Sequence, residues 1–98
     1  MTPKLTLKQY ADLIRANFPT RKPVILRTGY LKDEGSIAES EKSFYITVSR
    51  MLPLPAQKEA LLHEYAHAKA GWTDKRQHTD AWGIWYAKMY RKLYDEAE

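Results

Sequence analysis

The pentapeptide His63-Glu64-Tyr65-Ala66-His67 constrains this chain more than any other stretch. It lies in a segment from about Ala56 to Ala70 that is predicted to be helical, so its two histidines lie one turn apart on one face. Both imidazoles can then reach one metal ion, and Glu64 lies near the same face, where it can take a proton from a water molecule. The pattern H-E-x-x-H is rare in a chain of 98 residues, and it predicts a metal site.

A catalytic zinc site requires a third protein ligand and an open position for water. The candidates that follow His67 are Asp74, His78 and Asp80. Asp74 comes almost directly after the predicted helix end and would require a tight reversal of the chain, so we favour His78. Asp80 can accept a hydrogen bond from a ligating imidazole, or it can favour the start of the next helix through the helix dipole.

The elements around the motif predict an α+β fold. Thr6 and Gln9 form a capping box before a helix expected from Leu7 to about Asn17. Three β-prone runs follow, at residues 23–27, 36–39 and 43–49. In the last run the apolar residues Phe44, Ile46 and Val48 alternate with Tyr45, Thr47 and Ser49. This alternation is typical of a strand with one buried face. We expect about three strands in a small, mostly antiparallel sheet.

Two further signals concern the helices after the sheet. Gly71 suits the residue that closes the motif helix, and Thr79 can cap a last helix from about Asp80 towards Tyr94. One broad side of that helix is apolar and aromatic, including Trp82, and its simplest role is core packing. The chain is thus expected to be a single domain, residues 1–98, with an N-terminal helix, the sheet, the motif helix and a C-terminal helix.

Charge and composition limit the partners. The net charge of +4 is concentrated in residues 1–32, where seven lysines and arginines accompany Asp12 alone. This basic N-terminal third could face nucleic acid, although a solvated surface is the simpler interpretation, because no base-reading motif accompanies the charges. The absence of cysteine excludes disulfides and thiolate metal sites and fits a reducing compartment. With no apolar run of membrane-spanning length and no signal-like start, we expect a cytoplasmic protein with no membrane contact.

Two segments together resemble the SprT-like zincins and related minimal gluzincin-type metallopeptidases, which are common as small stand-alone forms in phages and prophages. These segments are His63-Glu64-Tyr65-Ala66-His67-Ala68 after a β-hairpin, and His78-Thr79-Asp80-Ala81-Trp82-Gly83 at the start of an aromatic-rich helix. The resemblance covers about Gly35 to Tyr90. It implies a zincin-like fold, Zn²⁺ bound by His63, His67 and His78, and Glu64 as general base and acid. It also implies a cleft beside the strand Phe44–Ser49, where substrate peptides pair in extended form.

These observations predict a zinc-dependent metallopeptidase that acts on a protein or peptide substrate. Tyr86 is the first candidate for additional support of the transition state. One alternative is a zinc-stabilised binding module without hydrolysis, against which the presence of Glu64 argues, since a structural site requires no base. Another is a protease acting on DNA-bound proteins, as Spartan-type relatives do, which the basic N-terminal third permits. Imidazole ligands also suit divalent ions other than zinc.

Overall fold

The computed structural model describes residues 5–71 and 79–97 of the chain. Within these ranges the elements follow in the order α1 (Leu7–Asn17), β1 (Val24–Gly29), β2 (Gly35–Glu39), β3 (Phe44–Ser49), α2 (Leu54–Ala70) and α3 (Asp80–Ala97). The strands form one sheet in the order β1-β3-β2. The predicted α+β class is confirmed, and the observed helices and strands begin and end within a few residues of the expected positions.

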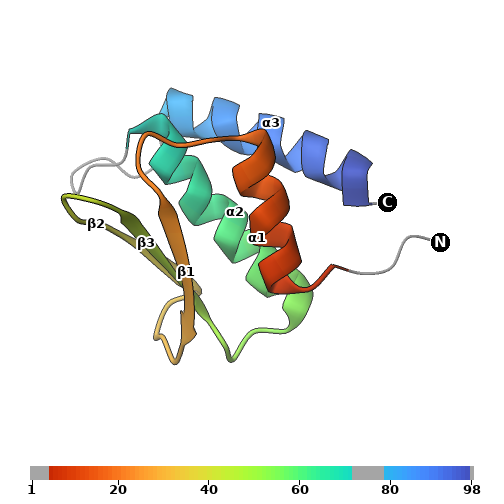
Figure 1. Ribbon diagram of the computed structural model, residues 1–98. Coiled ribbons are helices and arrows are strands. Elements are labelled where there is room, and N and C mark those ends of the chain that lie inside the picture. Colours follow the sequence, from red (N-terminus) through yellow and green to blue (C-terminus); the bar gives the residue numbers. More distant parts are fainter. Residues whose placement is uncertain (1–4, 72–78, 98) are drawn as a thin grey trace.

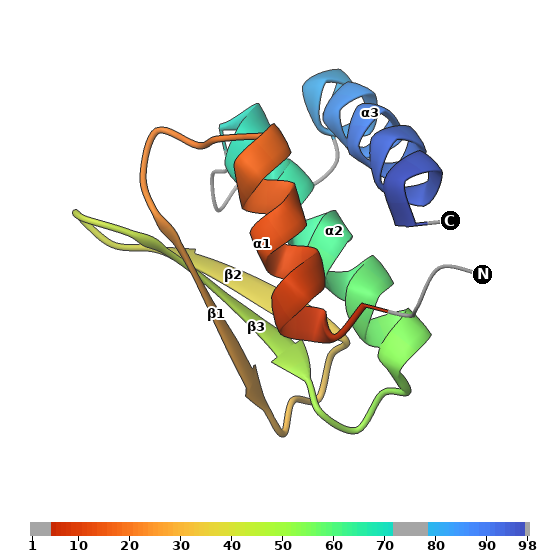
Figure 2. The same cartoon turned by 45° about the vertical axis from the view of Figure 1, so that its right-hand side comes forward.

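The elements are arranged in layers (Figures 1 and 2). α1 and α2 pack against one face of the sheet, while α3 packs against α2 and α1 and contacts no strand among the described residues. Because α2 lies between the sheet and α3, its middle is buried on nearly every side. The buried residues of α2 are Ala60, Leu61, Leu62, Glu64, Tyr65, Ala66, His67 and Ala68. The H-E-x-x-H motif therefore lies inside the molecule rather than on an outer helix face.

The capping box at the start of α1 forms as predicted. The backbone N–H of Gln9 donates to Thr6 Oγ1 at 3.1 Å, and the backbone N–H of Thr6 donates to Gln9 Oε1 at 2.9 Å. These bonds satisfy N–H groups that a helix start leaves without a partner. α1 ends at Asn17, ahead of Pro19, and the Tyr65 hydroxyl of α2 donates to the Phe18 carbonyl at 2.6 Å, which ties the end of α1 to the motif helix.

β3 is the central strand, and its inner face forms much of the core. Phe44, Ile46 and Val48 are fully buried, whereas Tyr45 and Thr47 between them are half-buried, as the alternation predicts. β2 pairs with β3 antiparallel, but β1 pairs with β3 parallel. The sheet is therefore mixed rather than mostly antiparallel. The alternation of a strand predicts which of its faces is buried but not which strands pair with it. Here β3 lies between β1 and β2, which follow each other in the sequence.

A proline in the first turn and a glycine after the last turn mark the two ends of the motif helix. α2 begins at Leu54, with Pro55 in its first turn, where a missing N–H costs no helical hydrogen bond. It ends at Ala70, and Gly71, which follows, has a φ of 80° in the left-handed region that glycine adopts without strain. None of the helices in the described ranges is both long and apolar enough to cross a membrane.

Candidate metal centre

His63, Glu64 and His67 come together as the helical spacing predicts. The two imidazole centroids lie 5.2 Å apart, and one ligand atom from each of the three side chains lies within 4.8 Å of the others. His67 is 6% exposed, while His63 is half-buried at the edge of a pocket. Two imidazole nitrogens and a carboxylate oxygen are the donor types that zinc uses in catalytic sites. The donors present therefore fit a zinc ion.

Glu64 is a buried carboxyl without a partner. It is only 9% exposed, and among the described residues it makes no hydrogen bond or ion pair. Burial penalises its charged form and raises its pKa from 4.5 to about 7. Near neutral pH this carboxyl is therefore poised between accepting and releasing a proton. A cation held by the two histidines would favour the ionised form and lower this pKa.

α3 encloses the histidine pair through Trp82. The Trp82 indole N–H donates to the His63 carbonyl at 3.1 Å, and its ring centroid lies 5.0 Å from that of His63 and 5.6 Å from that of His67. Tyr86 stacks on Trp82 at 5.2 Å. The backbone N–H of Trp82 also donates to Thr79 Oγ1 at 3.2 Å, so Thr79 caps α3 as predicted. The aromatic side of α3 thus serves the core and also contacts the imidazoles of His63 and His67.

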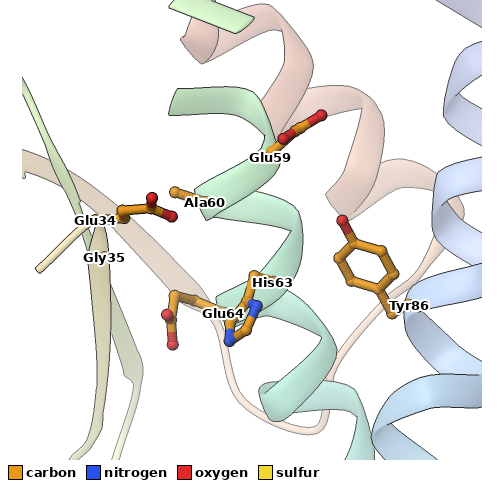
Figure 3. A pocket seen from close by; sticks show the side chains of 7 residues that line it. All are labelled: Glu34, Gly35, Glu59, Ala60, His63, Glu64 and Tyr86. Carbon is orange, nitrogen blue, oxygen red and sulfur yellow. The ribbon is translucent and has the colours of Figure 1, made fainter. Parts of the chain in front are cut away.

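A pocket of about 310 Å³ opens beside Glu64 (Figure 3). Its walls come from the start of β2, from α2 and from α3. The lining residues are Glu34, Gly35, Glu59, Ala60, His63, Glu64 and Tyr86. Tyr86 therefore lines the pocket beside Glu64, and its role in supporting the transition state stays a prediction. Burial, and to a smaller extent the nearby Glu59 carboxylate, raise the pKa of the Tyr86 hydroxyl, which stays protonated at neutral pH.

The remaining sequence predictions have different outcomes. His78 and the rejected candidate Asp74 lie outside the described residues, so the third ligand stays a prediction. Asp80 is exposed in the first turn of α3, where an acidic side chain favours the helix dipole. The prediction that substrate peptides pair with β3 is wrong, because both edges of β3 are paired within the sheet. The strand next to the pocket is β2, an edge strand.

Three residues that line the pocket, Glu34, Gly35 and Glu59, were not predicted as site residues from the sequence. Glu59 lies one helical turn before His63 on α2, so the spacing alone could have placed it near the site. Glu34 and Gly35 carry no comparable signal, because their position depends on β2 lying beside α2 rather than on local pattern.

Gly35 is expected to be required for the position of Glu64. A Cβ at residue 35 would lie 3.3 Å from both Glu64 Cγ and the Thr47 carbonyl oxygen, so Gly35→Ala should displace Glu64 or β2 by a few tenths of an ångström. If Glu64 is the predicted base of a zinc peptidase, such a displacement should reduce cleavage by about tenfold without loss of zinc, because hydrolysis depends steeply on the placement of the base. The measurement is kcat/KM on one peptide together with the zinc content.

Gly29→Ala is the matched control. A Cβ at residue 29 would meet Thr47 Cγ2 at 3.8 Å, an ordinary contact, so this variant should cleave like the parent. Equal activity of the Gly35→Ala variant and the parent would show that the close approach of β2 to Glu64 has no role in cleavage.

The comparisons with known proteins identify no relative: no family model matches the chain, and neither a curated protein nor a solved structure resembles it significantly. The case for a function therefore depends on the residues and geometry of the site.

Proposed function

We propose that this chain is a zinc-dependent peptidase in which His63 and His67 bind the metal and Glu64 acts as the base. The proposal is carried by one observation, the convergence of these three side chains to within 4.8 Å on a buried helix that borders a pocket. A purely structural metal site would not require an unpartnered carboxyl facing that pocket. His78 is the proposed third ligand.

The chain's own residues would perform the proton transfers. Bound zinc would supply Lewis-acid chemistry, which makes water more acidic and polarises the carbonyl of the substrate. Glu64 would accept a proton from the attacking water on its carboxylate and then donate that proton to the leaving amine. Burial raises the pKa of Glu64 to about 7 in the metal-free chain, and a bound cation would lower this pKa, so the ionised form that accepts a proton would face the attacking water.

Two further features support hydrolysis of an extended peptide. The Tyr86 hydroxyl lines the pocket and stays protonated, so it can donate a hydrogen bond to the oxygen that becomes negative during attack. β2 has one edge unpaired in the sheet, next to this pocket, and an extended segment can add to such an edge through backbone hydrogen bonds. We place the substrate along β2 rather than along β3.

The direct test is cleavage of an unfolded protein by the zinc-loaded chain. Gel electrophoresis should show fragments whose formation stops when a chelator removes the metal and resumes when zinc is added back. Cleavage that continues at the same rate in excess chelator would contradict a metal-dependent mechanism.

A further inference from the structure

The pocket beside Glu64 is strongly acidic although the chain as a whole is basic. The sequence contains 16 lysines and arginines against 12 aspartates and glutamates. Three of the seven described residues that line the pocket are nevertheless glutamates, Glu34, Glu59 and Glu64, and no lysine or arginine is among these seven. A solvated surface of average composition would carry both signs of charge. Glu64 would face the proposed zinc ion, so the two carboxylates that remain to attract a positively charged occupant are those of Glu34 and Glu59.

The two outer carboxylates lie on different walls of the pocket (Figure 3). Glu34 directly precedes β2, and its carboxylate points from the sheet side towards α2. Glu59 belongs to α2 itself. Both side chains are exposed. Within the described part of the chain neither forms an ion pair, because the ion pairs there involve Asp12 and Glu39. Glu34 and Glu59 thus leave two negative charges available at the mouth of the site.

A second metal ion does not fit these two carboxylates. Within the described ranges, the one group of three ligand atoms close enough to share an ion is that of His63, Glu64 and His67. Carboxylates on separate walls suit a long side chain whose cationic end can approach either of them. Glu64 is nine-tenths buried, has no hydrogen bond or ion pair to another described residue, and faces the same space, which marks the pocket as a place where a ligand is bound.

We propose that this pocket binds a lysine or arginine side chain of the substrate, next to the bond that is cleaved. The inference rests on the proposed peptidase function and names its specificity. A volume of about 310 Å³ accommodates one long side chain. Glu34 and Glu59 attract the cationic end, while acidic side chains are repelled. Because His63 and Glu64 share the pocket, the residue so held lies beside the reacting carbonyl.

The experiment uses capped peptides that differ at one position, with lysine, arginine, acetyl-lysine or glutamate in an otherwise neutral sequence. At low salt the zinc-loaded chain should cleave the lysine and arginine peptides with a kcat/KM on the order of tenfold above that for acetyl-lysine, as close charge pairs at a partly exposed site allow. The preference should shrink as salt screens the charges. Binding of the same peptides to the Glu64→Gln chain, measured by calorimetry, should follow the same order.

The double variant Glu34→Gln/Glu59→Gln should lose most of this preference, since both residues are exposed and the substitution preserves their shape. Glu41→Gln, an exposed glutamate in the turn between β2 and β3, is the matched control and should keep it. Equal cleavage of the lysine and acetyl-lysine peptides would overturn the specificity and leave the peptidase proposal intact. Charge-dependent binding without cleavage of any peptide would support the pocket and contradict the peptidase.

Discussion

Replacing Glu64 by glutamine is expected to reduce peptide cleavage by at least about 100-fold while zinc stays bound. Glutamine has nearly the same shape as glutamate, so the buried position can accept it without a new cavity. It cannot accept a proton from water, and therefore the proposed base is removed while the proposed metal ligands His63 and His67 are kept. The assay is kcat/KM on a peptide substrate, with zinc content measured on the same preparation.

Glu41→Gln provides the control for loss of one exposed carboxylate far from the pocket, and it should cleave like the parent. A Glu64→Gln variant that cuts as fast as the parent would exclude Glu64 as the base. A variant that loses zinc as well as cleavage would instead identify Glu64 as a metal ligand, which its distance from the histidines also allows. That second result would favour a zinc-stabilised binding module.

Replacing His67 by alanine is expected to abolish zinc binding and the stability that zinc provides. A ligand that binds only the folded chain stabilises it by about 4 kcal/mol when its free concentration is 1,000 times the Kd. For a domain of this size, that corresponds to a rise in Tm of roughly 15 °C or more. The parent should show this rise on addition of zinc, and the His67→Ala variant should show none.

The loss of packing must be separated from the loss of the ligand, because His67 is buried against Trp82. His67→Gln fills most of the same space, and its metal-free Tm should be close to that of the parent. It should still lack the zinc-induced rise, since an amide is a poor zinc ligand. An undiminished rise in both variants would place zinc elsewhere on the chain.

The sequence predicted the elements well because their signals are local. The Thr6 capping box, the alternation around Phe44, and the terminator Gly71 each act within a few residues. The four-residue spacing of His63 and His67 predicted their proximity for the same reason, once the helix was recognised.

The parts that escaped prediction depend on contacts between distant segments. Parallel pairing of β1 with β3 is a choice of neighbour that no strand pattern encodes. The placement of Glu34 in one pocket with Glu64 likewise depends on the contact between β2 and α2, which no local pattern encodes. The dual role of Trp82 was missed as well, since an aromatic stripe has the same appearance whether it packs on leucine or on a metal-binding imidazole.

The most direct test of the central claim is a crystal structure of the zinc-loaded chain with anomalous diffraction at the zinc edge. The account predicts one zinc ion bonded to imidazole nitrogens of His63 and His67 at about 2.0–2.1 Å, with His78 completing the protein ligands and Glu64 beside the position left for water. An anomalous peak elsewhere on the chain, or none at these two histidines under saturating zinc, would contradict it.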